Sequence, residues 1–356
     1  MTLSMKRIGI DARMAKHSGI GRYIRGFTSN LNFSHPNHQY LFIGRTEFQK
    51  TYYSGRNFVS LNAPIYSLSE QILLPIKAKS CNGLHVPHYN VPIFWQKKLI
   101  VTIHDLIHLE FAQDLNPAAQ AYSRIMLSLA IKKADAVICV SHKTKQDLIE
   151  KLGASKDKIT VIHHGVDPIF QKEQKKMTGL YFLCVGIIKS HKNLGILLDA
   201  FIQLRKKSGL DLKLRIVGKP DLKQKIVREW LNTISNEPNI SLNVNVNDEE
   251  LRGLYTNAAA LVFPSLYEGF GFPILEAMAS QTPVIAAHVS SIPEVAGNAA
   301  LYFDPHSNSD LMGCMEKILG DSAMRNQLIQ NGAERVKQFT WEKATSQLEH
   351  VYESVI

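Results

Sequence analysis

The sequence contains no long apolar run. None of its hydrophobic stretches approaches the roughly 18 residues that a membrane-spanning helix requires, so we predict a chain that does not cross a bilayer. The opening residues MTLSMKRIGIDARM carry lysine and arginine, but they continue into a strand-length segment that contains Asp11 and not into the apolar stretch of a secretory signal. We therefore expect a cytoplasmic protein.

Cysteine is scarce, and no two cysteines are spaced as a CxxC pair. The cysteines are Cys81, Cys139, Cys184 and Cys314. We expect them to be small interior side chains, neither disulfide partners nor metal ligands. His85, His88 and His108 lie near one another in sequence, but we expect His85 and His88 in a different loop from His108, and the spacing makes no zinc signature. We therefore predict no metal and no other cofactor.

A complete GxGxxG dinucleotide-binding fingerprint is also missing. The first loop, DARMAKHSGIGRYIRGF, supplies Gly19 and Gly21 but has Ile24 where the third glycine would stand. A GxG pair alone is a weak signal, and the missing glycine disfavours a nicotinamide dehydrogenase.

The charge of the chain is uneven. The net charge of +10 lies entirely on residues 1–170, because basic and acidic residues are equal in number over residues 171–356. This asymmetry suits an anionic partner, either lipid headgroups or a phosphorylated substrate, or else it serves solubility. Basic residues do not interleave with aromatic ones, so we do not expect nucleic acid as a partner. The segment SLSEQILLPIKAK places apolar residues beside lysines, as either a core helix or a membrane-interface helix would.

The chain does contain a regular alternation of short β-rich runs with helix-length amphipathic segments. The runs are RIGID, YLFIG, LIVTIHD, AVICVS, KITVI, YFLCVG, KLRIVG, ISLNV, ALVFP and PVIAA. Strands that alternate with helices predict an α/β fold with parallel sheets covered on both faces. Because one domain usually takes about 100 to 200 residues, the 356 residues predict two Rossmann-like domains with a cleft between them.

The boundary is expected where the apolar periodicity lapses, in PIFQKEQKKMTG. We predict a first Rossmann-like domain over residues 1–170 and a second over residues 171–339. A helix is expected over residues 340–356, with Thr340 as its N-cap. Periodicity leaves open whether this helix packs on the second domain or returns to the first.

The loops that follow strands are the places to look for chemistry, because ligands of open α/β sheets bind beyond the carboxyl ends of the strands. After ALVFP comes SLYEGFGFPILE, in which Pro273 suits a first helical turn, and Gly269 and Gly271 let the backbone approach a ligand. The N–H groups of a helix start favour a diphosphate, and Glu268 and Glu276 can accept hydrogen bonds from hydroxyls on either side of it. A nucleotide sugar would satisfy this pattern.

The segments SLYEGFGFPILEAMASQTPVI and SSIPEVAGNAALYFDP resemble the E-x7-E segment of family 4 glycosyltransferases and its continuation. These are retaining enzymes of the two-domain GT-B type, and the similarity extends over nearly the whole chain. The resemblance implies that residues 1–170 form the acceptor-side domain and that residues 171–339 form the nucleotide-sugar-binding domain. The resemblance implies that Glu276 binds the ribose hydroxyls of the donor and that Glu268 holds the donor sugar. It gives the same sugar-holding role to the backbone of Gly269, Phe270, Gly271 and Phe272.

The segment VGIIKSHKNLGILLDAF resembles the donor-phosphate segment of the same family. The resemblance implies that Lys192, a few residues after the strand-end Gly186, reaches the diphosphate. Many relatives carry an arginine directly after that glycine, where this chain has Ile187, so we expect Lys189 or His191 to act as the second phosphate cation. A preorganised cation here would stabilise the leaving diphosphate.

In the first domain, LIVTIHDLIHLEF places His104 and Asp105 at the end of a strand. The resemblance gives His104 a contact to the donor sugar near the reacting carbon, whereas Asp105 either orients His104 or caps the next turn. It also implies that the loop with Gly19 and Gly21 accommodates donor phosphate and acceptor. Arg22 is then either an acceptor-phosphate contact or a solvated helix arginine.

Together these inferences predict a retaining hexosyltransferase that needs no metal. In the front-face mechanism that the resemblance implies, the leaving diphosphate accepts the proton of the acceptor hydroxyl. GIGRYIRGF, LYEGFGFPILEAMA and the KN pair after the strand look most like bacterial mannosyltransferases of surface-polysaccharide assembly. GDP-mannose is therefore the favoured donor. The expected acceptor is a saccharide, free or lipid-linked, reached by an enzyme that is peripheral on the inner face of an anionic membrane.

Three alternatives stay open at this level. They are a transferase that uses a UDP-hexose, a GT-B-fold sugar-nucleotide epimerase, and a non-catalytic nucleotide-sugar-binding protein. An epimerase needs further acid and base carboxylates, and donor hydrolysis would exclude a non-catalytic protein.

Overall fold

The protein is described by a computed structural model over residues 5–172 and 180–356. Most of the predicted boundary segment, residues 173–179, lies outside the described residues. The chain divides into two compact units. Unit 1 comprises Met1–Gly165 and Trp341–Ile356, and unit 2 comprises Val166–Thr340.

Unit 1 is built on a parallel sheet in which the described residues form seven strands, in the order β3-β2-β1-β4-β5-β6-β7. The strands are β1 (Lys6–Asp11), β2 (His38–Gly44), β3 (Phe58–Ser60), β4 (Gly83–Val86), β5 (Lys98–Ile103), β6 (Ala136–Cys139) and β7 (Ile159–Val161). The chain passes from β1 to β2 and β3 on one side of β1, and it then returns to β4 on the other side of β1. The carboxyl ends of β1 and β4 therefore mark the switch point of this sheet.

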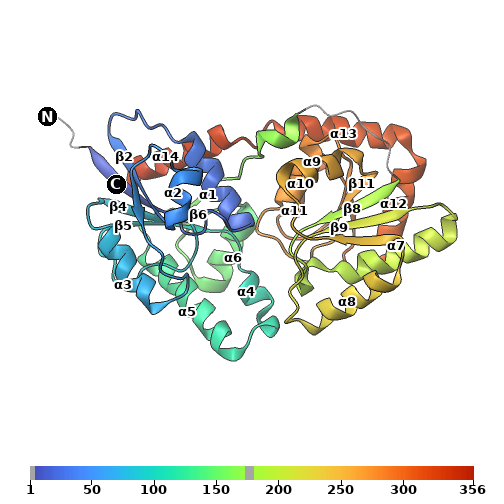
Figure 1. The fold of residues 1–356 in the computed structure, drawn as a ribbon, viewed down its shortest axis with the longest axis horizontal. Helices are drawn as coiled ribbons and strands as arrows, with labels where there is room; N and C mark the ends of the chain where they lie inside the picture. The colour runs from blue at the N-terminus through green and yellow to red at the C-terminus, as the bar shows by residue number, and fades with distance from the viewer. Residues whose placement is uncertain (1–4, 173–179) are drawn as a thin grey trace. The chain divides into compact units, whose positions relative to one another are not determined.

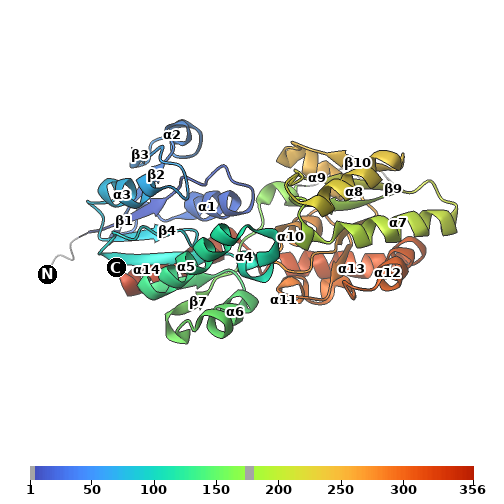
Figure 2. The ribbon, with the colours of Figure 1, turned by 90° about the horizontal axis from the view of Figure 1, so that it is seen from below.

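Helices cover this sheet. They are α1 (Gly19–Asn30), α2 (Thr46–Tyr52), α3 (Leu68–Lys77), α4 (Ile107–Glu110), α5 (Pro117–Lys133), α6 (His142–Leu152) and α14 (Trp341–Val355). Helix α14 returns to unit 1 and lies beside α1 (Figures 1 and 2). A Cβ at Gly26 of α1 would lie 2.2 Å from the Trp341 ring, so glycine is needed where the two helices meet.

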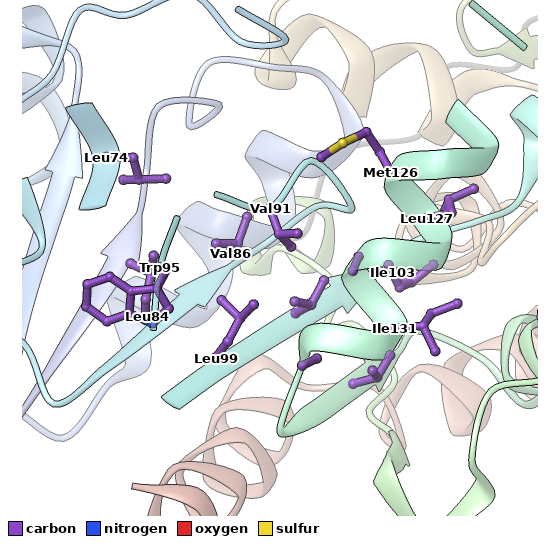
Figure 3. Packing of buried hydrophobic residues seen from close by; sticks show 14 of the residues in the cluster. Leu74, Leu84, Val86, Val91, Trp95, Leu99, Ile103, Met126, Leu127 and Ile131 are labelled. Carbon is purple, nitrogen blue, oxygen red and sulfur yellow. The ribbon is translucent and has the colours of Figure 1, made fainter. Parts of the chain in front are cut away.

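One core of unit 1 lies between the sheet and the helices α3 and α5. Leu84 and Leu99 of neighbouring strands face Leu74 of α3 and Leu127 of α5 in one buried cluster (Figure 3). The cysteines Cys81 and Cys139 belong to the same cluster and carry free thiols. This packing fixes the strand ends from which the loops of unit 1 emerge.

Unit 2 contains a second parallel sheet, whose described strands follow the order β10-β9-β8-β11-β12-β13. The strands are β8 (Tyr181–Val185), β9 (Lys213–Val217), β10 (Ile240–Asn243), β11 (Ala260–Phe263), β12 (Val284–Ala287) and β13 (Ala300–Phe303). This order is the one shared by dinucleotide-binding Rossmann sheets. Its interior strands β11 and β12 are buried throughout, which explains their continuous apolar runs.

The helices of unit 2 lie on both sides of its strands, with α7 and α8 on one side and α9, α10 and α13 on the other (Figure 1). They are α7 (Leu194–Ser208), α8 (Lys225–Asn236), α9 (Asp248–Asn257), α10 (Phe272–Ala279), α11 (Ile292–Ala296), α12 (Asn308–Gly320) and α13 (Ser322–Val336). Two α/β units with parallel sheets confirm the predicted fold class. Within the described part of the chain, no helix is both long and apolar enough to cross a membrane.

Candidate active site

The site in unit 2 lies at the switch point of its sheet. Strands β8 and β11 are neighbours, but the chain leaves β8 toward β9 and leaves β11 toward β12. A crevice therefore opens beyond their carboxyl ends, where Rossmann sheets bind nucleotides. A small pocket here is lined by Gly186 and Lys192 after β8, and by Phe263, Pro264 and Ser265 at the end of β11.

Lys192 and Glu268 meet at this switch point. Lys192 ends the 3₁₀ turn Ser190–Lys192, and its Nζ lies 2.5 Å from Oε1 of Glu268. The two side chains are only 20% and 12% exposed. Gly186, at φ +150°, lies beneath the lysine, since a Cβ there would sit 3.6 Å from Lys192 Cε. A cation at the end of β8 is thus held in place by a carboxylate from the loop after β11.

The backbone of the glutamate loop is held by two serines. Ser290 Oγ donates to the carbonyl oxygen of Glu268 at 2.7 Å, and Ser291 Oγ lies 2.9 Å from the same oxygen. Ser291 Oγ also lies 3.0 Å from the carbonyl oxygen of Phe270. The two serines follow β12 and begin the SSIPEVAG segment. The resemblance of this segment to family 4 glycosyltransferases drew attention to the two serines. It did not predict that their hydroxyls support the glutamate loop.

Helix α10 begins directly after this loop. Gly271 precedes it at φ +122°, and Phe272 and Pro273 form its first turn. Glu276, one turn further on, is 2% exposed, and the hydroxyl of Tyr255 donates to its Oε2 at 3.0 Å. Tyr255 of α9 therefore orients the Glu276 carboxylate, and the sequence did not predict this support.

We expect Glu276→Gln to lower the affinity for the donor and for the free nucleoside diphosphate by the same factor, because Glu276 is predicted to bind the ribose that both ligands share. The loss should be about 1.5 to 3 kcal/mol, the range for a hydrogen bond to a charged group. Isothermal titration of the folded variant measures it. Tyr255→Phe is the matched control, since it removes only the orienting hydrogen bond and should cost less. Unchanged nucleotide affinity in Glu276→Gln would show that the carboxylate is structural.

The other predicted phosphate ligands lie in the same turn. His191 is buried at 5% exposure, and its carbonyl oxygen accepts the N–H of Leu266 at 2.8 Å, which ties the turn to the glutamate loop. The carbonyl oxygen of Lys189 accepts the N–H of Lys192 at 2.9 Å. Ile187 is 37% exposed. The second phosphate cation stays a prediction for Lys189 or His191.

In unit 1, His104 directly follows β5, and its Nε2 lies 3.0 Å from the carbonyl oxygen of Pro87. Because a carbonyl only accepts, Nε2 carries the hydrogen in the neutral ring. Burial lowers the pKa of His104 to about 4, so the ring is neutral at physiological pH. Asp105 Oδ1 accepts the N–H of Ile107 at 3.0 Å, so Asp105 forms an Asx turn just before α4.

The glycine loop of unit 1 leads into α1. A Cβ at Gly21 would lie 2.6 Å from the carbonyl oxygen of Ala15, so only glycine allows this close approach. A Cβ at Gly19 would meet nothing within 4 Å, so packing in unit 1 does not require glycine there. Arg22, one residue after Gly21, is partly buried in the first turn of α1.

The sequence did not predict the buried charged cluster at the switch point of unit 1. Arg13 Nη2 lies 2.6 Å from Asp11 Oδ2, and Arg13 Nη1 lies 2.9 Å from Glu70 Oε2. Although burial alone would raise it, the pKa of Asp11 is held well below its usual range by the adjoining Arg13 guanidinium. The imidazole Nε2 of His88 lies 3.8 Å from Asp11 Oδ2. Glu70 is distant in sequence, so no local pattern could have joined it to Arg13.

Two buried histidines, His85 and His164, contact α14, one near its last turn and one at its first residue. His85 lies inside β4, where its Nδ1 is 2.7 Å from the Tyr352 hydroxyl and its Nε2 is 2.8 Å from Thr102 Oγ1. The predicted loop position of His85 is therefore wrong, because these two hydroxyls satisfy its ring inside the sheet. Burial lowers the pKa of His85 to about 3, and it lowers the pKa of His164 well below the usual value.

We expect unit 1 to lose stability as the pH falls from about 6.5 toward 4. The unfolded chain binds protons on its histidines in this window while the folded chain does not, so the free energy of unfolding decreases on acidification. Each such histidine contributes about 1.4 kcal/mol per pH unit. Urea unfolding at pH 7.5 and 5, followed by tryptophan fluorescence, measures the loss. His85→Gln should reduce this pH dependence, and an equal dependence in both proteins would contradict the assignment.

The chain shares its fold with glycosyltransferases of known structure. A glycosyltransferase from Rickettsia africae ESF-5 superposes with a TM-score of 0.74 at 16% identity, over 99% of this chain and 98% of that one. Two Rossmann-like units, each with its own parallel sheet, define the fold as that of GT-B proteins.

Sequence comparison makes the class more specific. The family model described as "Glycosyl transferases group 1" matches residues 166–335, and "Glycosyltransferase Family 4" matches residues 44–170. The O-antigen chain mannosyltransferase RfbU of Salmonella typhimurium is 30% identical over 71% of this chain and 69% of its own length. The O-antigen chain mannosyltransferase B of Escherichia coli is 29% identical over 75% and 73%. The chain belongs to glycosyltransferase family 4, the group 1 glycosyltransferases, and is a retaining hexosyltransferase that uses a nucleotide-sugar donor.

Proposed function

We propose that the protein transfers mannose from GDP-mannose to an acceptor hydroxyl of a growing saccharide, with retention of configuration. The observation that carries this proposal is the Lys192–Glu268 pair at the switch point of unit 2, next to the loop that leads to Glu276. Mannose is supported by the two relatives, both named as O-antigen chain mannosyltransferases.

The Lys192–Glu268 pair suggests how the nucleotide-sugar donor binds. One ammonium lies against one carboxylate, so a diphosphate bound beside Gly186 would compete for Lys192 and release Glu268 to accept hydrogen bonds from sugar hydroxyls. Lys192 then stabilises the charge that builds on the leaving diphosphate, while the backbone of Gly269–Phe272, steadied by Ser290 and Ser291, holds the sugar. The leaving diphosphate takes the proton of the acceptor, so no strong base is needed.

The first unit is proposed to supply the acceptor side. His104 acts on turnover more than on nucleotide binding, and Arg22 contacts an acceptor phosphate. The glycine loop with Gly19 and Gly21 accommodates donor phosphate and acceptor. We propose a lipid-linked saccharide as the acceptor, because the net charge of +10 on residues 1–170 attracts anionic lipid at the inner face of a membrane.

Titration with GDP, UDP, GDP-mannose and UDP-glucose tests the donor. Tighter binding of GDP than of UDP, with GDP-mannose tighter than UDP-glucose, is the expected result. The measurement needs no acceptor. Preference for UDP and UDP-glucose would replace GDP-mannose by a UDP-hexose and leave the family assignment untouched.

A further inference from the structure

Helix α3 buries polar side chains and exposes apolar ones, which is the reverse of an ordinary surface helix. Its polar residues Glu70 and Gln71 are buried, at 1% and 7% exposure. Leu68, Ile72 and Ile76, spaced four residues apart on one stripe, are 87%, 55% and 52% exposed. A surface helix normally presents its polar face to water and its apolar face to the core. The stripe therefore leaves apolar surface without cover in the folded chain.

The reversal has a clear structural cause. Glu70 turns inward because it binds Arg13 of the buried charged cluster at 2.9 Å. Gln71 turns inward because its Oε1 accepts the N–H of Ile93 at 2.8 Å. The helix is thus held by its polar side chains, and its orientation cannot be reversed without breaking both contacts. Leu74 and Ala78 are the residues of this segment that enter the apolar cluster between the sheet and the helices α3 and α5.

The apolar surface continues beyond the helix. The hydrogen bond from Ile93 to Gln71 fixes the loop after β4 against α3, and this loop exposes 43% of Ile93 and 65% of Phe94. We call Leu68, Ile72, Ile76, Ile93 and Phe94 the α3 face. Exposed apolar residues that gather on adjoining elements mark an interaction surface, whereas scattered ones do not.

Lysines border the α3 face. Lys77 ends α3 and Lys79 follows it, and both are exposed. Lys97 Nζ donates to the carbonyl oxygens of Lys79 and Cys81 at 2.7 and 2.8 Å, which places a third ammonium at the same end of the helix. These cations belong to the half of the chain that carries the whole net charge of +10.

We propose that the α3 face is the surface by which the enzyme lies on an anionic lipid bilayer. Aliphatic and aromatic side chains would enter the headgroup boundary, and the lysines beside them would meet lipid phosphates. A second copy of the chain suits the surface less, because a symmetric interface would set the same lysines against each other. The proposal rests on the lipid-linked acceptor proposed above and names the residues that reach its membrane.

Co-sedimentation with vesicles tests the surface. The intact protein should pellet with phosphatidylcholine vesicles that contain phosphatidylglycerol, at low salt and without nucleotide, and less at high salt. Lys77→Gln with Lys79→Gln should weaken this binding by about fivefold for each lysine. The triple variant Leu68→Ser, Ile72→Ser and Ile76→Ser should weaken it by at least about tenfold. All these side chains are exposed, so the variants should keep the parent melting temperature.

Matched changes on unit 2 provide the controls. Leu210, Leu222 and Ile226 are 47%, 58% and 39% exposed, and the triple replacement by serine removes the same number of exposed apolar side chains far from α3 in sequence. Lys206→Gln with Lys223→Gln removes the same charge as the α3 lysine pair. Both controls should bind vesicles like the parent. An equal loss in the controls would show that general hydrophobicity or net charge is responsible, and it would overturn the proposal.

Three further outcomes would also overturn it. They are equal pelleting on neutral and anionic vesicles, no pelleting on either, and a dimer seen by light scattering that the triple variant dissociates. The last would make the α3 face a contact between copies. Titration of the same preparations with GDP-mannose separates this proposal from the donor assignment. Vesicle binding without GDP-mannose binding would refute the donor alone, and the reverse result would refute the α3 face alone.

Discussion

Lys192→Ala should lower the affinity for the nucleoside diphosphate by about 1.5 to 3 kcal/mol, roughly 10- to 150-fold. The variant removes the cation that lies 2.5 Å from Glu268 at the switch point of unit 2. It also leaves that carboxylate, 12% exposed, without its partner and close to the incoming phosphates. Turnover should fall further, by about 100- to 1,000-fold, because charge grows on the leaving group in the transition state. Isothermal titration and single-turnover donor cleavage measure the two losses.

The matched control is Lys189→Ala, three residues earlier in the same loop. If Lys189 is the second phosphate cation, its loss should lower diphosphate affinity less than the loss of Lys192. If it is only a surface lysine, its replacement should have no effect. The nucleoside without phosphates should bind parent and Lys192→Ala equally. Unchanged diphosphate affinity in folded Lys192→Ala would refute the phosphate role.

His104→Ala should lower turnover by about 10- to 100-fold, the equivalent of one hydrogen bond formed mainly in the transition state. The affinity for the nucleoside diphosphate should change less than twofold by the same argument. His104 lies at the end of β5 as a neutral ring whose Nε2 is committed to Pro87, so it acts without charge. Donor cleavage and nucleotide titration on one preparation give both numbers.

His104→Gln is the companion variant, since its amide can still donate to the Pro87 carbonyl. If His104 only braces the loop, glutamine should restore turnover fully, whereas a sugar contact should be restored in part at most. Turnover within a few-fold of the parent in His104→Ala would make the residue structural.

The strands could be predicted where apolar runs are long and β-branched, as in β5 and β11. Three strands, β3, β4 and β13, were not predicted. Strand β4, GLHV, contains a glycine and a histidine, which are poor strand signals, but the polar partners Thr102 and Tyr352 satisfy His85 in the interior. Strand β3 has only three residues. Burial and long-range hydrogen bonds determine whether such segments form strands, and neither can be read from the local sequence.

The site likewise contains residues that the sequence could predict and residues that it could not. Lys192, Glu268 and Glu276 follow strands or open a helix, so local sequence together with the rule on strand ends could point to them. Ser290, Ser291 and Tyr255 support those residues from other loops and helices, and only the folded chain shows this. The exposed stripe of α3 is a similar case. SLSEQILLPIKAK predicts an apolar helix, but the inward turn of Glu70 depends on Arg13, far away in sequence.

The most direct test of retaining mannosyl transfer is proton NMR of the sugar first released from GDP-mannose in water. No acceptor has to be known, because water can take its place. Cleavage on the face from which the diphosphate leaves predicts that α-mannose, the anomer of the donor, appears before mutarotation. Glu268→Gln and Lys192→Ala should suppress the signal. Early release of β-mannose would contradict retention, and release of sugar from UDP-glucose but not from GDP-mannose would contradict the donor.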